Sequence, residues 1–312
     1  MRKAADELTT YLGCPRKYEF KHVLELTGET QQNRDAFRKL LREVICTGYN
    51  TARQTDREPR KGAHEALESL WKSYVETADH HSRRQESTEK ARAEAGLEAY
   101  FETVGPTHLD GIERAAELCE RPVVGPDLTL STTIQETQVS VTVDYIMSHG
   151  GSLVAVRLTD QLWASRVPYA SDSEIAQEHL EQGLYAPQKV GTVIGARIAE
   201  QALGEYVADG TGTELMYLSV LEETFETDGD CEAVTDQQRM GEFLTESRQT
   251  IDDAIVWMAE NIAAGNYDPV DVFDEQSHWD GSFEQVVENS CQYCPYAVGC
   301  QEAIRREVMF NV

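Results

Sequence analysis

Apolar residues in the first half of the chain recur at intervals of three and four, as expected for amphipathic helices. Residues 33–52 show this spacing through Leu40, Leu41 and Val44. The same periodicity predicts three further helices, over residues 63–78, 85–103 and 111–119. The first part of the chain is therefore expected to be helical.

The pattern then changes to alternation among β-branched residues. This alternating pattern predicts three strands, at residues 128–134, 139–147 and 153–158. His149-Gly-Gly151 predicts a hairpin turn between the last two. A helix over residues 171–207, broken or kinked at Pro187, is expected next, followed by a fourth strand at 214–221. The last long helix is expected at residues 235–263.

This order of elements favours an α/β fold with a mixed sheet flanked by helices. A length of 312 residues fits one large domain, which we divide into three consecutive parts. These parts are a helical region at 1–125, a core sheet with its helix at 126–222, and a C-terminal helix with a cysteine cluster at 223–312. No apolar run approaches the length of a membrane span, and the N-terminus lacks the apolar core of a signal peptide. A cytoplasmic protein with no membrane partner is expected.

The charge balance is strongly acidic. The formal net charge is −27, with 55 acidic residues against 28 basic ones, and only eight of the basic residues are lysines. Acid-rich, lysine-poor chains are typical of extreme halophiles. At about 1 M salt the Debye length is about 3 Å, so repulsion that would strain the fold in dilute buffer is screened. An ordinary acidic protein in low salt is the alternative.

Acidity normally argues against a nucleic-acid partner, but in a halophile the whole surface is acidic and the argument weakens. The positions of the basic residues then become informative. They gather in the first fifty residues, where Arg16, Lys17, Lys21 and Arg38 are candidate contacts for DNA phosphates. The alternative is that these side chains pair with neighbouring acids.

Three cysteines lie within ten residues near the C-terminus, in Cys291-Gln-Tyr-Cys294-Pro-Tyr-Ala-Val-Gly-Cys300, and a fourth candidate is Cys14. Four thiolates suit an iron–sulfur cluster or a tetrahedral zinc ion. A typical zinc ribbon pairs two Cys-x-x-Cys knuckles, and this chain has one, so a 4Fe–4S cluster is favoured over zinc or plain thiols. Such a cluster requires the two ends of the chain to meet, and it would hold them together.

The terminal phrases resemble a known family. Thr9-Thr-Tyr-Leu-Gly-Cys14-Pro-Arg-Lys-Tyr18-Glu-Phe20 is similar to the opening of RecB-like nucleases of the PD-(D/E)XK (restriction-endonuclease-like) superfamily. Gly265-Asn-Tyr267-Asp-Pro269 and Cys294-Pro-Tyr296 resemble the family's ending. The iron–sulfur branch includes AddB-type helicase–nucleases and CRISPR-associated RecB-like exonucleases. The resemblance implies a PD-(D/E)XK core, DNA as single strands or ends, and a helicase, repair or CRISPR partner.

In that superfamily, carboxylates on adjacent strands hold Mg²⁺ or Mn²⁺ and a lysine assists. Asp144 matches the first carboxylate, in Val141-Thr-Val-Asp144. Arg157 stands where the second carboxylate belongs, and Thr159 where the lysine belongs. A guanidinium across the hairpin from Asp144 would form an ion pair in place of the metal. If the protein cuts DNA, Asp144 is the expected metal ligand and Asp160 a displaced second ligand.

Other expected positions match less well. The family's early histidine falls near Arg38, and Gln182-Gly-Leu-Tyr185 has the residue types of a later helix motif one position too close. Glu136 and Glu174 are possible substitute ligands. Three readings stay open: a non-catalytic DNA-binding or scaffold subunit with a degenerate metal site, an active Mg²⁺- or Mn²⁺-dependent exonuclease or endonuclease, and an electron-transfer protein. The loss of a carboxylate and its lysine favours the first.

Overall fold

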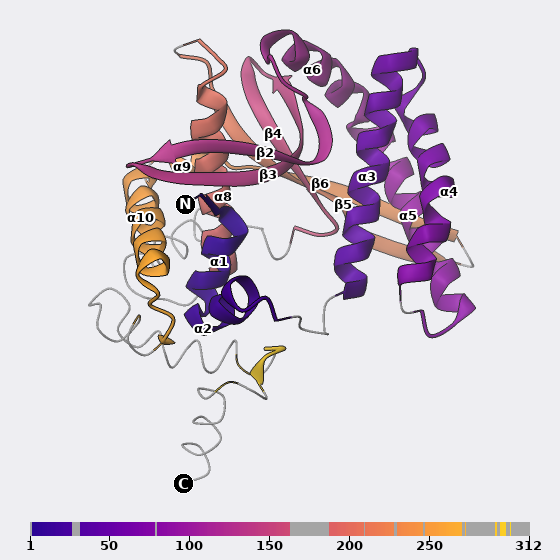
Figure 1. The fold of residues 1–312 in the computed structure, drawn as a ribbon. Helices are drawn as coiled ribbons and strands as arrows, with labels where there is room; N and C mark the ends of the chain where they lie inside the picture. Colours follow the sequence, from indigo (N-terminus) through magenta and orange to yellow (C-terminus); the bar gives the residue numbers. More distant parts are fainter. Residues whose placement is uncertain are drawn as a thin grey trace.

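The strands that the structure describes form one six-stranded mixed sheet with helices packed against it (Figure 1). The structure is a computed structural model, and it describes residues 2–26, 32–78, 80–162, 187–208, 210–227, 230–245, 247–269, 272, 291, 294–297 and 300. In Figure 1, α3, α4 and α5 lie on one side of the molecule and α1, α8 and α10 on the other. The predicted α/β class with a mixed, helix-flanked sheet is confirmed.

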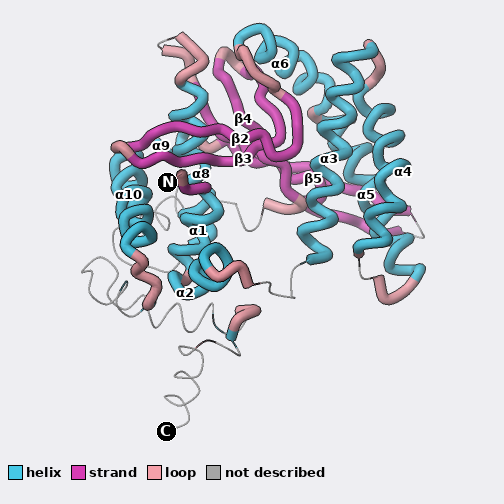
Figure 2. The backbone as a smooth tube through the Cα atoms, in the orientation of Figure 1, coloured by secondary structure: helices cyan, strands magenta, loops and turns pink. Residues whose placement is uncertain are grey.

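The sheet is built on an antiparallel meander followed by a parallel strand (Figure 2). The meander consists of β2 (Val124–Ile134), β3 (Thr137–His149) and β4 (Ser152–Thr159). Next to β4 lie β5 (Thr213–Thr227), in parallel, and then β6 (Asp230–Arg239), antiparallel to β5. Gly150 and Gly151 adopt positive φ in the predicted hairpin turn before β4, a conformation that glycine adopts without strain. The short β1 (Lys3–Ala4), parallel to β3, was not predicted.

The N-terminal region is helical, and the periodicity predicts its four helices after residue 31. Its elements are α1 (Ala5–Gly13), α2 (Pro15–Tyr18), a π-helix η1 (Glu19–Val23), α3 (Gln32–Thr55), α4 (Pro59–Thr77), α5 (Arg83–Thr103) and α6 (Gly105–Leu118). Their starts follow local chemistry. Pro15 and Pro59 occupy first-turn positions, where a missing N–H costs little, and the Ser82 hydroxyl accepts a hydrogen bond from the Gln85 N–H at 3.2 Å.

The C-terminal half departs from prediction at one element. The expected helix at 235–263 is wrong at its start, because residues up to Arg239 belong to β6. The apolar periodicity there is weak, and pairing with β5, from Met216 opposite Arg239 to Thr227 opposite Asp230, decides the conformation. Only the later part is helical, as α9 (Gly241–Leu244) and α10 (Arg248–Ala264). The helix expected over 171–207 is described from Pro187, where α8 (Pro187–Gly204) begins.

A buried chain of hydrogen-bonded aromatic residues ties the helical region to the sheet. Tyr49 Oη and Tyr100 Oη are 2.7 Å apart, and Tyr100 Oη and Tyr145 Oη are 2.9 Å apart. Tyr145 Oη also lies 2.7 Å from His108 Nδ1. All four side chains are buried, so these bonds satisfy polar atoms that water does not reach. The chain links α3, α5 and α6 to β3.

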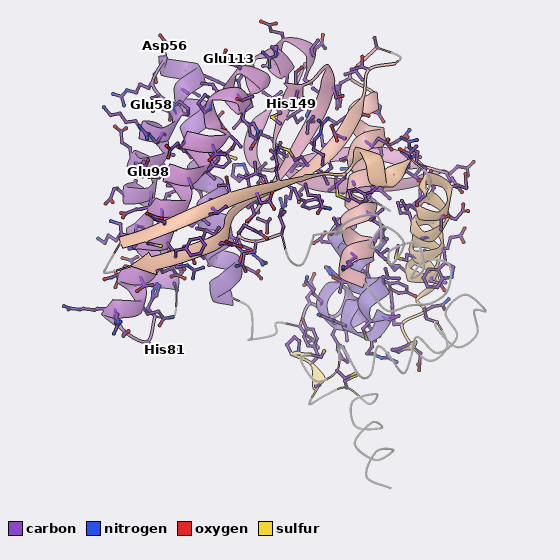
Figure 3. The ribbon with its side chains drawn as sticks, turned by 180° about the vertical axis from the view of Figure 1, so that it is seen from behind. Asp56, Glu58, His81, Glu98, Glu113 and His149 are labelled. Carbon is purple, nitrogen blue, oxygen red and sulfur yellow. The ribbon has the colours of Figure 1, made fainter. Side chains whose placement is uncertain are left out.

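The acid-rich composition appears at the surface. Seen from behind in Figure 3, Asp56, Glu58 and Glu98 lie at the outer edge of the helical region, and all three are exposed. Glu113 of α6 is exposed as well. Among the helices in the described segments, none is both long and apolar enough to cross a membrane.

Candidate functional site

Three arginines and three aspartates gather where α3 meets the meander, and we call them the ion-pair cluster: Arg38, Arg42, Asp127, Asp144, Arg157 and Asp160. Asp144 of β3 is its most buried member, with no exposed surface. Arg42 Nε donates to Asp144 Oδ1 at 2.6 Å. The main-chain N–H of Leu158, in β4, donates to Asp144 Oδ2 at 2.7 Å. Both carboxylate oxygens of Asp144 therefore accept hydrogen bonds from the protein itself.

Two of the arginines come from α3. Arg38 and Arg42 are four positions apart, so they lie one turn apart on the same side of the helix. The buried Leu41 and Val44 anchor α3 in the core. Arg38 Nε donates to Asp160 Oδ1 at 2.6 Å, directly after the end of β4. One helix thus presents one guanidinium to each of the two aspartates that the sequence singles out.

Asp127 and Arg157 complete the cluster at its exposed side. Arg42 Nη2 donates to Asp127 Oδ1 at 2.6 Å, so Arg42 bridges Asp127 and Asp144. Arg157 Nη1 lies 3.5 Å from Asp127 Oδ1 and 3.9 Å from Asp144 Oδ1. Asp127 has a φ of 65°, a left-handed conformation that aspartate tolerates better than most residues. Asp127 lies where the pairing of β2 with β3 is irregular, between Val124 and Leu128.

The pKa shifts of the acids and of Arg42 reflect their opposite charges. Burial raises the pKa of Asp144, and the charges of Arg157 and Arg42 act in the opposite direction. Partial burial of Asp127 acts to raise its pKa, but the hydrogen bond and charge of Arg42, with the charge of Arg157, bring it below its ordinary value. Burial of Arg42 favours the neutral form, yet the charge of Asp144 and the hydrogen bonds to both acids raise its pKa. Each acid is stabilised as a carboxylate by the arginines beside it.

The arrangement limits the chemistry that Asp144 can perform. Mg²⁺ and Mn²⁺ bind anionic oxygens, and a guanidinium at 2.6 Å occupies such an oxygen with a permanent positive charge. A metal ion at Asp144 would first have to displace Arg42. Among the residues that the structure describes, no group of three or more His, Cys, Asp or Glu side chains is placed to hold a metal ion. The geometry is that of an ion-pair network.

The sequence predicts an ion pair between Arg157 and Asp144, and the structure contains it, with Nη1 and Oδ1 3.9 Å apart, although Arg157 is not the nearest cation. The pairing of Tyr145 with Val156 places Arg157 opposite Asp144, as expected. Its guanidinium nevertheless lies nearer to Asp127, and the closest guanidinium to Asp144 is that of Arg42. The reason is that an arginine on a packed helix reaches over the sheet, an arrangement that strand register alone does not reveal.

Asp160 is the residue that the sequence offers as a displaced second metal ligand. It follows β4, where its carboxylate is drawn to α3 by Arg38, so it belongs to the same cluster as Asp144. Its main-chain oxygen accepts hydrogen bonds from Ser219 Oγ at 2.7 Å and from the Leu221 N–H at 2.9 Å. These bonds fix Asp160 to β5.

Of the substitute ligands weighed from the sequence, Glu136 is exposed in the turn before β3, away from the residues that form the ion-pair cluster. The other substitute, Glu174, and the helix motif of Gln182 and Tyr185 lie outside the described residues. Sequence reasoning assigned neither Asp127 nor Arg42 to the site around Asp144. The one available signal for Arg42 was its spacing of a single helical turn from Arg38.

Cys14 lies at the start of α2, where it is the N-cap residue. Its Sγ accepts a hydrogen bond from the Lys17 N–H at 3.4 Å. Burial raises the pKa of the Cys14 thiol to about 12, with a hydrogen bond from Lys17 opposing this and the charges of Cys291 and Cys294 adding to it. The sulfur of Cys14 is therefore within electrostatic reach of two cysteines from the far end of the chain.

Contacts between the two ends of the chain confirm that they meet. Tyr296 Oη donates to the main-chain oxygen of Leu26 at 2.9 Å, and its ring lies 5.5 Å from that of Phe20. A little earlier in the sequence, Tyr267 stacks on Tyr18 at 6.0 Å. In Figure 1 the segment around residue 296, in yellow, lies beside α2. The N-terminal helices and the cysteine segment form one contact region.

The donor set in this region is uniform in chemistry. Cys14, Cys291, Cys294 and Cys300 are in the thiol form and not in disulfides, and Cys300 is buried. Four sulfur donors without a carboxylate or imidazole suit an iron–sulfur cluster or zinc, and not Mg²⁺ or Mn²⁺. The donor chemistry fits a thiolate-bound centre, although the sulfurs of the described residues are not gathered into a ligand set.

The four candidate DNA contacts differ in their surroundings. Arg16 pairs with Glu19 at 2.5 Å and lies 3.6 Å from Asp268, and Arg38 pairs with Asp160. Lys17 is half-buried and Lys21 is exposed.

The chain was compared with known protein families and with curated proteins. No protein-family model matches the chain, and no curated protein matches it.

Proposed function

We propose that this chain is a DNA-processing protein with a RecB-like PD-(D/E)XK core whose catalytic metal has been replaced by arginine side chains. The order of elements supports the core assignment, because a three-stranded meander, then α8, then a strand parallel to β4 is the order expected of that fold. The observation that carries the proposal is the bonding of Asp144, whose two oxygens accept from Arg42 and Leu158.

Without a free carboxylate pair the chain would hold DNA and leave cutting to a partner. Such a protein is a non-catalytic DNA-binding or scaffold subunit acting in repair or recombination, with a helicase or CRISPR protein as the partner. Lys17 and Lys21 are the candidate phosphate contacts, since Arg16 and Arg38 already pair with acids. In this proposal the arginines of the ion-pair cluster preserve the fold around Asp144 in place of the metal.

The proposal includes a 4Fe–4S cluster on Cys14, Cys291, Cys294 and Cys300. The contacts of Tyr296 with Phe20 and Leu26 support it, because they bring the two cysteine-bearing segments together. When bound, the cluster would supply iron–thiolate bonds that hold the two ends of the chain. Zinc remains the alternative, and the absorbance of the purified protein near 400 nm separates the two.

The test is a cleavage and binding assay in multimolar KCl, with protein purified without oxygen. Single-stranded DNA is incubated with Mn²⁺ and with wild type, Asp144→Ala or the surface control Glu113→Ala, and binding is measured in parallel. We expect no cleavage by any of the three proteins and binding by wild type and Glu113→Ala. Cleavage that disappears only in Asp144→Ala would overturn the proposal in favour of an active nuclease, and absence of DNA binding would overturn the DNA-processing role.

A further inference from the structure

A cavity of about 900 Å³ lies between the N-terminal segment, the start of β3 and the end of α10. Its lining includes Lys3, Tyr18, His22, Gln138, Glu260 and Tyr267. Its volume falls in the range of small-molecule sites, about 300–1,000 Å³. The ion-pair cluster contributes none of the described lining residues, so the cavity is separate from the site discussed above.

Lys3 places a buried positive charge on the wall of this cavity. The residue is 6% exposed, and its Nζ donates to Tyr18 Oη at 2.9 Å. Its ion pair with Glu7 is long, with Nζ and Oε2 4.0 Å apart, which is beyond hydrogen-bonding distance. An ammonium has three N–H donors, so within the described part of the chain two of them meet no acceptor. Because a buried ammonium with unused donors and only a long ion pair is incompletely stabilised, an anionic group entering the cavity would stabilise Lys3.

Aromatic rings stand next to that charge. The rings of Tyr18 and His22 are 4.9 Å apart and inclined by 32°, and those of Tyr18 and Tyr267 are 6.0 Å apart and inclined by 26°. His22 Nε2 is buried, and among the described residues it has no hydrogen-bond partner. Roughly parallel rings beside a cation are the combination that binds a nucleotide, with its base stacked and its phosphate paired.

The exposed part of the lining carries the opposite charge. Glu136 and Glu260 both line it and are exposed. A polyphosphate would bring more negative charge into a cavity that already holds these carboxylates, whereas a single phosphate can pair with Lys3. The exocyclic amine of adenine, cytosine or guanine can donate to a carboxylate. The charge distribution therefore selects a monophosphate whose base carries an amine.

We propose that this cavity binds one nucleotide with a single phosphate, with the phosphate on Lys3 and the base against the rings of His22 and Tyr267. Two sources share this chemistry: a free nucleoside monophosphate and the 5′-phosphorylated end of a DNA strand. The choice of a nucleotide rests on the proposed DNA-processing function, whereas the cavity, the cation and the rings do not.

The experiment is calorimetric titration of the full-length protein, purified without oxygen in multimolar KCl. The free-ligand arm compares deoxyadenosine 5′-monophosphate with deoxyadenosine. The strand arm compares a ten-residue deoxyadenosine oligomer carrying a 5′-phosphate with the same oligomer carrying a 5′-hydroxyl. We expect the phosphate to strengthen binding at least tenfold in one of the two arms, the size of one charge-assisted hydrogen bond. The arm that responds identifies the source.

The variants are Lys3→Met and, as a matched control, Lys72→Met, which removes an exposed lysine of α4. Lys3→Met is expected to abolish the tenfold effect of the phosphate, and Lys72→Met to preserve it. Equal affinity of wild type for phosphorylated and unphosphorylated ligands in both arms would overturn the inference, and this comparison needs no variant to fold. DNA binding without any phosphate effect would overturn the inference alone. Binding of the free monophosphate without DNA binding would support the inference and overturn the proposed function.

Discussion

Replacing Arg42 by methionine tests the ion-pair cluster directly. The substitution removes the 2.6 Å bond to Asp144 and leaves that fully buried carboxylate with the Leu158 N–H at 2.7 Å and Arg157 at 3.9 Å. Removing one partner of a buried pair costs about 3–5 kcal/mol, because the other charge stays buried. We expect about 3 kcal/mol at pH 7, since Leu158 and Arg157 retain part of the stabilisation.

The assay is urea unfolding in multimolar KCl, followed by circular dichroism, for Arg42→Met, Asp144→Asn and the double variant. The double variant should lose less stability than the sum of the two single variants, by about 2 kcal/mol, because neither partner is then left charged and alone. The control is Arg57→Met, whose partner Glu65 lies 3.2 Å away with both side chains about half exposed. An exposed pair of this kind contributes about 0–1 kcal/mol.

The cost of Arg42→Met should also depend on pH. Burial already raises the pKa of Asp144, and loss of Arg42 removes a charge that opposes the rise. The folded variant then binds a proton more tightly than the unfolded chain, so it regains stability as pH falls towards the ordinary carboxyl range of about 4. Equal losses in Arg42→Met and Arg57→Met, or additive losses in the double variant, would refute a coupled buried pair.

Two further outcomes follow from the structure. Burial lowers the pKa of His108 to about 4 from an ordinary 6.5, so its contribution to stability should be fully present above pH 6.5 and fall by up to about 3 kcal/mol as pH drops towards 4. His108→Asn should flatten this pH dependence, measured as the midpoint of urea unfolding, and an unchanged pH dependence would contradict the prediction. Cys14→Ser should remove the iron absorbance band and lower the melting temperature, whereas Cys231→Ser should keep the band; retention of full absorbance by Cys14→Ser would exclude Cys14 as a ligand.

Local patterns predicted most elements and missed those that distant pairing determines. The helices predicted over residues 33–52 and 85–103 correspond to α3 and α5, because residues at helical spacing form an apolar face that is buried only if the segment is helical. The second half of the edge strand β6, residues 235–239, fell within the predicted helix, because its conformation comes from pairing with β5. The two-residue β1 has no pattern of its own and exists through its pairing with Val139 and Ser140.

The residues of the candidate site also differ in whether local sequence patterns could identify them. Asp144 could be identified from the sequence because it lies in a predicted strand at a motif position. Its complete burial is unusual for a carboxylate and marks it as a candidate site residue. Arg42 could not be identified in this way, because its role depends on how α3 packs over the meander. Asp127 was missed for a related reason, since it lies at an irregular point of β2 and meets Arg42 only in the folded chain. Sequence identifies the buried acid, and tertiary packing identifies the cation that stabilises it.

The charge balance of the chain makes that cation informative. A buried carboxylate such as Asp144 requires a compensating positive charge, which in this fold can come from a divalent cation or from a guanidinium. The two exclude each other, because both use the same oxygens. In a chain with 28 basic residues and a net charge of −27, three arginines lie within reach of three aspartates around this one position. A catalytic metal ion bound there would be opposed by those arginines, so the location of the scarce positive charges supports the proposal of a non-catalytic protein.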